Sequence, residues 1–280
     1  MNDMSNHSCP VCQNCQNNRL QDERLQVFVC GNCGHVFSEN NVAVETIYNP
    51  DYYLAEHKNW FLHPNFKLFG IIESCLKNNF DNQNINILDV GCGRGDLLHF
   101  LHSRQPDWNL WGIDVSENKE DGIIYLQGDF VGHDFNREFN AVVGLMVIEH
   151  IPDLVSFVKK ISTVLSGGGM VFLVTINSNS VIYGLARILR RFGWRGPYDR
   201  LYHHHHLQHF NSSSLRRLME KNDFTVVKQY SHNFPLSALD LPQGSRFLGL
   251  VYYCAIACMF FVTNIFGGGL NQTIICKKKV

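Results

Sequence analysis

Residues 85–96 read Ile-Asn-Ile-Leu-Asp-Val-Gly-Cys-Gly-Arg-Gly-Asp, and this stretch decides the fold. Its first half is a short apolar run with the length and branching of a buried strand. Three alternating glycines follow, and apolar residues then recur at helical spacing over 97–101. Strand, glycine turn and helix in this order open a nucleotide-binding α/β unit. The glycines let the backbone turn tightly and approach a ligand, although a plain βα loop would have the same pattern.

An acid near the end of this strand narrows the interpretation. Asp89 stands two positions before the first glycine, and the glycines are spaced GxGxG rather than GxGxxG. The pattern resembles the first motif, (D/E)xGxGxG, of the class I S-adenosylmethionine (SAM)-dependent methyltransferases, and residues 85–176 match that family in order. The resemblance implies a doubly wound, Rossmann-like α/β fold, with a seven-stranded sheet whose last strand is antiparallel. It also implies SAM as the cofactor, bound by Asp89, Gly91, Gly93 and Gly95.

Acids also stand at the ends of the next two expected strands. Asp114 ends the second, where a carboxylate can accept both hydroxyls of a ribose; a helix cap or a solvated charge is the alternative. Asp129 follows the third, where the family has an acid that accepts the adenine amino group, although Gly-Asp is also a common turn. Ligands of parallel α/β sheets lie outside the carboxyl ends of the strands, so these side chains should converge. The expected cofactor site is completed by Val115, Phe130 and Met146.

The pattern continues through strand 139–147 into Glu149 and His150, where it is similar to the family sequence FDxVxxxxxLEHxxD. Alternating strands and helices predict a parallel sheet with right-handed crossovers. The remaining expected elements are a surface helix at 65–79, a helix at 154–165 from an Asp153 cap to the glycine run 166–169, a strand at 170–175, a helix at 214–221 after an Asn211/Ser212 cap, and an antiparallel pair of strands at 224–231 and 271–277.

Histidines supply the candidate catalytic groups. Methyl transfer from a sulfonium to a hydroxyl needs alignment and a base. His150 is the first candidate, because it follows the fourth strand and would face the sulfonium; ordering the loop or pairing with Glu149 is the alternative. His209 is the second candidate. We expect the run 203–206 to be a solvated loop, with metal binding as the alternative, and one histidine of this group could still reach the acceptor.

Two CxxC pairs near the N-terminus predict a metal site. Cys9 and Cys12 form one pair, and Cys30 and Cys33 the other, so four thiolates can surround a structural Zn²⁺. Cys15 offers a competing pair with Cys12. Zinc-ribbon methyltransferases that act on small molecules look similar, with a CxxCG ribbon followed by a YxxxYY-type segment. That resemblance implies that an aromatic group lies over the cofactor, with ordinary packing as the alternative; its members are Tyr48, Tyr52, Tyr53, Trp60 and Phe61.

These features divide the chain into three expected parts. A zinc ribbon covers 1–45, with a linker beginning at 36, and an aromatic linker with a lid helix covers 46–84. The methyltransferase domain covers 85–280, with insertions at 177–210 and 232–268. The paired cysteines and the absence of an apolar leader predict a cytoplasmic protein without a secretory signal.

Charge and hydropathy suggest the partners. The net charge of −1 provides no general attraction for nucleic acid. The first insertion carries five arginines, which favour an anionic or lipid-linked acceptor or a membrane surface, with a solvated basic face as the alternative. The apolar run 247–266 is long enough to span a bilayer, but strands of one sheet should flank it, so a single crossing is excluded. Peripheral, non-spanning contact with a membrane is the hypothesis. The arginines are Arg187, Arg190, Arg191, Arg195 and Arg200.

The preferred interpretation is a SAM-dependent methyltransferase acting on a small molecule. The resemblance favours a hydroxyl of a saccharide or lipid-linked precursor as the acceptor. An RNA methyltransferase that holds RNA with its ribbon is one alternative, and a ribbon poor in Lys and Arg counts against it. A catalytically silent SAM-binding scaffold is the other.

Overall fold

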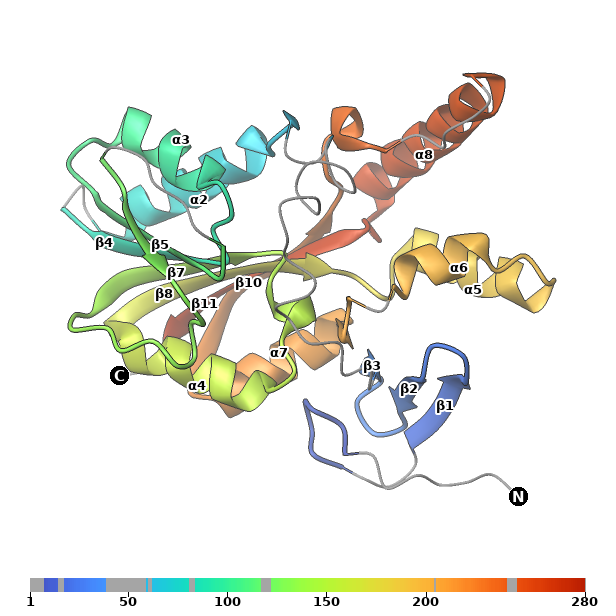
Figure 1. Ribbon diagram of the computed structural model, residues 1–280, viewed down its shortest axis with the longest axis horizontal. Helices are drawn as coiled ribbons and strands as arrows, with labels where there is room; N and C mark the ends of the chain where they lie inside the picture. Colours follow the sequence, from blue (N-terminus) through green and yellow to red (C-terminus); the bar gives the residue numbers. More distant parts are fainter. Residues whose placement is uncertain are drawn as a thin grey trace.

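A seven-stranded sheet forms the centre of the protein (Figure 1). The computed structural model describes residues 8–14, 18–38, 59, 62–80, 84–116, 122–203, 205–240 and 246–279. The strand order is β10-β11-β8-β7-β4-β5-β6. Its parallel part comprises β4 (Asn86–Val90), β5 (Asn109–Asp114), β6 (Ile124–Gln127), β7 (Phe139–Leu145) and β8 (Leu165–Ile176).

The other edge of the sheet reverses direction. β11 (Asn271–Lys278) lies antiparallel between β8 and β10 (Phe224–His232). The α/β, Rossmann-like architecture and the antiparallel last strand expected from the sequence are therefore confirmed.

Helices cover both faces of this sheet (Figure 1). α2 (Phe66–Asn79) and α3 (Asp96–Arg104) lie on one face, while α4 (Leu154–Val164) and α7 (Ser212–Lys221) lie on the other. Each face has its own apolar core: Leu76 and Leu98 are fully buried on the first, and Phe157 and Leu215 on the second. Side-chain caps fix three helix starts, at Asn65, at Asp153 and at Asn211 in a capping box. The expected caps at Asp153 and Asn211 are thus present.

The glycine run 166–169 corrects one expectation, because it does not follow the helix directly. α4 ends at Val164, and β8 already begins at Leu165, which pairs with Phe139 across an irregular register. The Ser166 hydroxyl donates to the carbonyl oxygen of Phe139 at 3.1 Å. Residues 166–169 therefore form an irregularity at the start of a twelve-residue strand, because regular pairing resumes only where Met170 lies opposite Ala141.

The ribbon, by which we mean residues 8–38, contains a second sheet. Its strands are β1 (Asn18–Asp22), β2 (Val27–Cys30) and β3 (Val36–Ser38), and a fourth, β9 (Gln208–His209), comes from far along the chain. Residues 36–38 are therefore strand rather than the start of a linker, because they pair with both β2 and β9. The expected aromatic group, Tyr48 to Phe61, and Cys15 lie outside the described residues.

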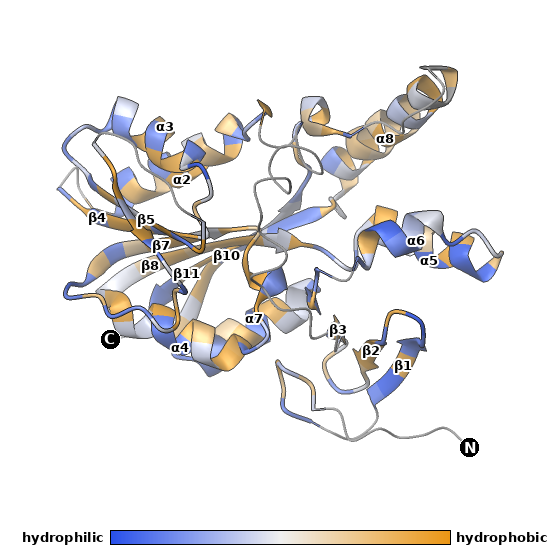
Figure 2. Ribbon diagram, in the orientation of Figure 1, coloured by the Kyte–Doolittle hydropathy of each residue, from blue (hydrophilic) through white to orange (hydrophobic). Residues whose placement is uncertain are grey.

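Both insertions are helical and extend away from the sheet (Figures 1 and 2). The first forms α5 (Val181–Arg191) and α6 (Gly196–Leu201), and the second forms α8 (Arg246–Phe266). Within the described residues, α8 is the one helix long and apolar enough to cross a membrane by length and composition. Its neighbours β10 and β11 pair with each other, so a single crossing between them is incompatible with this sheet.

Candidate active site

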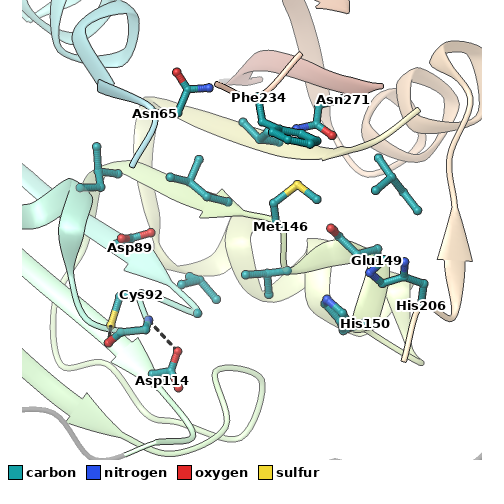
Figure 3. Close-up of a pocket in the computed structure, with 18 of the residues that line it drawn as sticks. Asn65, Asp89, Cys92, Asp114, Met146, Glu149, His150, His206, Phe234 and Asn271 are labelled. Carbon is teal, nitrogen blue, oxygen red and sulfur yellow. Dashed lines mark hydrogen bonds between the residues drawn. The ribbon is translucent and has the colours of Figure 1, made fainter. Parts of the chain in front are cut away.

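A cavity of about 560 Å³ opens at the carboxyl ends of the parallel strands. On one side lie Asp89, Cys92 and Asp114, and on the other lie His150 and His206 (Figure 3). The first group comes from the strand tips of β4 and β5. The second comes from the loop after β7 and from the first insertion. We call the side with Asp89, Cys92 and Asp114 the cofactor side, and the side with His150 and His206 the histidine side.

The glycine turn after β4 forms the floor of the first side. Gly91 has φ +66°, and a Cβ there would clash with Cγ2 of Val147, which is part of the cavity wall. Gly95 has φ +78°, and a Cβ there would meet the hydroxyl of Tyr125. Both positions therefore need glycine for backbone conformation and for space. Gly91 and Gly93 line the cavity, whereas Gly95 begins α3 as its N-cap.

Asp114 is held at the end of β5. Its Oδ2 accepts the Gly93 amide at 2.8 Å, and its Oδ1 accepts both the amide and the hydroxyl of Ser116. The carboxylate is thereby fixed beside the glycine turn, as a bidentate contact to two ribose hydroxyls requires. Its neighbour Val115, which is exposed, also lines the cavity.

Asp129 and Phe130 line the cavity beyond the end of β6. Asp129 is exposed and accepts the Gly132 amide at 2.8 Å. Phe130 is buried and packs edge-on against Phe157 of α4. The structure therefore places a carboxylate and an apolar ring next to each other, as the expected adenine contacts require.

Asp89 is the one acid of this side that lacks a full set of partners. Its side chain is only 3% exposed, and in the described part of the chain its Oδ1 has no hydrogen-bond partner. Burial raises the pKa of Asp89 well above its usual value, and the negative charges of Asp114 and Asp96 raise it further. A cationic ligand would supply both a donor and the missing positive charge, so this side fits SAM.

Met146 stands between the two sides of the cavity (Figure 3). Its φ is +58°, an uncommon conformation for a residue other than glycine. The Met146 amide donates to the carbonyl oxygen of Val174 at 2.8 Å, which fixes the kink at the end of β7. Such outliers persist when the surrounding structure determines them, and they cluster at binding sites.

The histidine side contains a compact polar cluster. Ligand-type atoms of Glu149, His150 and His206 all lie within 4.8 Å of one another, so the three could hold a metal ion. Burial raises the pKa of Glu149 to about 7, and its Oε2 accepts the Thr175 hydroxyl at 2.8 Å. Burial lowers the pKa of His206 well below its usual value, so this histidine is neutral. Nδ1 of His150 lies 2.8 Å from the carbonyl oxygen of His205, to which it must donate.

His209, the second candidate base, does not line this cavity. It is fully buried, its ring packs against Tyr202, and its Nδ1 lies 3.2 Å from the Tyr183 hydroxyl. Burial lowers the pKa of His209 to about 3. The run 203–206 is likewise not a uniform solvated loop, because His205 and His206 reach the cavity wall.

The arginines of the first insertion divide between two environments. Arg190 and Arg195 pair with Asp22 of the ribbon at 2.6 and 2.9 Å, and Arg187 donates to the carbonyl oxygen of Ser178. These three hold the fold together. Arg200 lines the cavity and makes no ion pair with any described residue, and Arg191 is exposed.

The cysteine pairs come together as the sequence suggests. All four sulfurs lie within 4.8 Å of one another, with Cys9 and Cys33 3.6 Å apart and Cys12 and Cys30 3.5 Å apart. A tetrahedron of sulfurs with Zn–S bonds near 2.3 Å has edges of about 3.8 Å, so the cluster fits Zn²⁺. The Cys33 pKa is lowered because the Cys9 thiol donates to it, which favours the thiolate that metals bind.

Residues 66–229 match the family model described as a methyltransferase domain. The chain belongs to this methyltransferase family. A ubiquinone biosynthesis O-methyltransferase of Pseudomonas aeruginosa is 28% identical over 149 residues, which are 47% of this chain and 63% of that protein. The mitochondrial enzyme of the same name from Dictyostelium discoideum is 28% identical over 123 residues, 36% of this chain and 38% of its own length. The chain thus matches less than two thirds of these curated relatives.

Solved structures agree on the methyltransferase fold. The plantazolicin methyltransferase BpumL in complex with SAH has a TM-score of 0.55 at 17% identity, covering 83% of this chain and 92% of its own. A Burkholderia thailandensis 1,6-didemethyltoxoflavin-N1-methyltransferase, also with SAH, has a TM-score of 0.55 at 12% identity, covering 94% and 99%. At such identities the likeness extends to the fold alone.

Several wall residues of this methyltransferase were not foreseen. Phe234, Pro235 and Ala238 arrive on the second insertion, whereas His206 belongs to the histidine run from which one member could reach the acceptor. Asn271, at the start of β11, also lines the cavity. Asn271 carried no distinct signal, because Gln272 and Thr273 follow it and the strand opens with three polar residues.

Proposed function

We propose that the protein is a SAM-dependent methyltransferase that transfers a methyl group to a hydroxyl of a small molecule. The observation that carries this proposal is the division of the cavity. Its cofactor side has a buried, incompletely partnered carboxyl at Asp89 beside a glycine turn anchored by Asp114. Its other side has a histidine whose tautomer is fixed. The relatives' names support an oxygen acceptor.

The cofactor-side residues would bind and orient SAM. Asp114 would accept the ribose hydroxyls, Asp129 the adenine amino group, and Phe130 would pack against the ring. Asp89 would face the cationic amino-acid end. When bound, SAM supplies an activated methyl group on a sulfonium, so alignment and proton removal are what the protein must add.

His150 is the proposed base. Because Nδ1 donates to the carbonyl oxygen of His205, the neutral ring carries its proton on Nδ1 and presents Nε2 as an acceptor. A hydroxyl next to Nε2 could therefore give up its proton during transfer. Glu149 and the neutral His206 flank this ring within the cluster, so His206 adds no positive charge that would compete with the proton taken up by His150.

The proposed acceptor is amphiphilic, either a lipid-linked saccharide precursor or another molecule with an apolar part. Phe234 and Pro235 line the cavity, and Phe234 packs edge-on against Phe260 of α8 with ring centroids 5.2 Å apart. The inner side of α8 thus supports the cavity wall, while Phe261 and Phe266 on its outer side are 68% and 82% exposed. Figure 2 shows α8 as a largely apolar helix that projects from the protein.

The exposed apolar side of α8 supports peripheral membrane docking as the route by which the acceptor arrives. The proposed location is the cytoplasmic side of that membrane. Exposed apolar side chains on a helix that does not span the membrane can insert at the boundary between lipid headgroups and acyl chains. Flotation with vesicles of phosphatidylethanolamine and phosphatidylglycerol tests it. Phe261→Gln/Ile265→Gln should abolish flotation, whereas the control Val227→Gln, on edge strand β10, should not. A wild-type protein that stays at the bottom of the gradient refutes the docking.

Transfer of tritium from methyl-labelled SAM to sugar nucleotides, phenols, lipid extracts and RNA tests the function itself. We expect label in a hydroxyl compound, and we expect His150→Gln to lower kcat at least one hundred-fold, within the usual range for a general base. Metal content distinguishes a base from a metal-dependent mechanism, because one zinc per chain that is lost in Cys33→Ser leaves no ion for the cluster of Glu149, His150 and His206. Label only in RNA would favour the nucleic-acid alternative. SAH binding without methyl transfer to any of these compounds would favour a catalytically silent, SAM-binding scaffold.

A further inference from the structure

We infer that the N-terminal ribbon positions the acceptor wall of the cavity. This inference rests on the proposed function, because it assigns the ribbon to the histidine side of that same site. Two seams carry the argument. One joins β3 to segment 205–211, and the other joins β1 to the helices α5 and α6.

At the first seam, β3 binds the outer edge of segment 205–211. The Ser38 amide donates to the carbonyl oxygen of Leu207 and the Ser38 hydroxyl to that of His206, both at 2.9 Å. His35 is fully buried, and its Nε2 lies 3.0 Å from Oε1 of Gln208. Its Nδ1 lies 3.3 Å from the Ser214 hydroxyl, so both ring nitrogens of His35 have partners at this seam.

The inner edge of the same segment holds the loop that carries the candidate base. The Leu207 amide donates to the carbonyl oxygen of Glu149 at 2.8 Å, and the Gln208 side chain donates to that of Ile151 at 3.0 Å. His150 lies between these two anchor points. Segment 205–211 is therefore a bridge, with the ribbon bonded to one edge and the catalytic loop to the other.

The second seam consists of two ion pairs that share the buried carboxylate of Asp22. Asp22, at the end of β1, is 2% exposed and receives both Arg190 and Arg195. Next to it, the Gln21 side chain donates to the Tyr198 hydroxyl at 2.8 Å. These contacts fix α5 and α6, and α6 ends in the cavity wall. The ribbon thus supports the histidine side from two directions.

The cofactor side has a different support. The hydrogen bonds and ion pairs of the ribbon described above all reach residues 190–214, whereas the acids proposed to contact SAM come from β4, β5 and the end of β6 and share only an apolar core with the ribbon. Loosening the ribbon should therefore misplace the acceptor and the base while leaving cofactor affinity unchanged. A purely structural ribbon would lower both together.

Ser38→Ala tests the seam with a single lost hydrogen bond, and His35→Leu tests it with a larger change. Ser166→Ala is the matched control, because it removes one serine-to-carbonyl bond at the far end of β8. Ser38→Thr keeps the hydroxyl and should rescue. Calorimetry with SAH measures the cofactor side. Hydrogen exchange of peptides covering 205–211 and 91–96 measures the two sides directly, and tritium transfer to the first compound that the wild type methylates gives kcat and KM.

We expect Ser38→Ala to lower kcat/KM about five-fold, the factor that one hydrogen bond corresponds to, and His35→Leu to lower it further. Both variants should speed hydrogen exchange in 205–211. Their SAH affinity and their hydrogen exchange in 91–96 should match those of the Ser166→Ala control. Parallel loss of SAH affinity, or unchanged exchange in 205–211, would overturn the inference. A wild type that methylates nothing would refute the proposed function. Hydrogen exchange needs no acceptor, so it would still decide whether the ribbon positions segment 205–211.

Discussion

Glu149→Gln should stabilise the protein, and by an amount that grows with pH. The Glu149 side chain is fully buried, its Oε2 accepts one hydroxyl, and its Oε1 has no partner among the described residues. Burial raises its pKa from 4.5 to about 7. The folded protein therefore prefers the protonated carboxyl, and stability is lost as pH rises from the unfolded value through the folded one.

The size of the effect follows from these two values. A pKa difference of about 2.5 between the folded and unfolded states lowers the free energy of unfolding by about 3 kcal/mol when the carboxyl is fully ionised, near pH 8 and above. At pH 5 the same linkage amounts to only about 1 kcal/mol, because the folded carboxyl is still protonated there. The glutamine keeps the shape without the charge. Its advantage over the wild type should therefore be about 2 kcal/mol larger at pH 8 than at pH 5.

Urea unfolding at pH 5, 6, 7 and 8 measures this difference. Thr175→Val is a useful companion, because it removes the one hydroxyl that favours the ionised carboxylate and should steepen the loss of stability with pH. A Glu149→Gln advantage that is the same at all four pH values would refute the reasoning, as would a variant that is less stable than the wild type at pH 8. The latter result would indicate that Glu149 is ionised and bound to a cation.

Two further predictions concern the glycine turn and the metal site. Gly91→Ala should lower the free energy of unfolding by about 1–3 kcal/mol, because φ is +66° and the new methyl group would displace Val147 from the cavity wall. In the control Gly184→Ala, in α5, the methyl group meets open space, so the free energy of unfolding should rise by about 0.5–1 kcal/mol. Urea unfolding measures both changes. The purified protein should carry one zinc per chain by mass spectrometry, and Cys33→Ser should lose the metal and lower the melting temperature. A metal content of zero in protein purified without chelators would contradict the zinc assignment.

The convergence of the strand-end acids on one side of the cavity could be predicted from the sequence for a physical reason. Asp89 and Asp114 stand at fixed offsets from a glycine turn and from a strand end, and parallel strands bring their carboxyl ends together whatever the loops do. Met146 was expected at the same edge by the same rule. Its positive φ could not be foreseen, because it depends on Val174 in a neighbouring strand.

The acceptor side could not be predicted in the same way. β9 has two residues, too few for any periodic pattern, yet it joins the ribbon to the site. The arginines of the first insertion suggested an anionic ligand, but Arg190 and Arg195 pair with Asp22, a residue far away in the sequence. His209 looked like a candidate base, whereas tertiary packing buries it away from the cavity. Each outcome depends on contacts between distant segments, which local sequence patterns do not encode.

Calorimetry with SAH tests the central claim, that the strand-end acids grip an adenosyl cofactor. We expect the wild type to bind one SAH, and Asp114→Ala to weaken binding by about 1–3 kcal/mol, since a charged hydrogen-bond partner is lost. The control Asp134→Ala, an exposed acid outside the cavity, should bind as the wild type does. A wild type that shows no heat with either SAH or SAM, or an Asp114→Ala variant of unchanged affinity, would contradict the account.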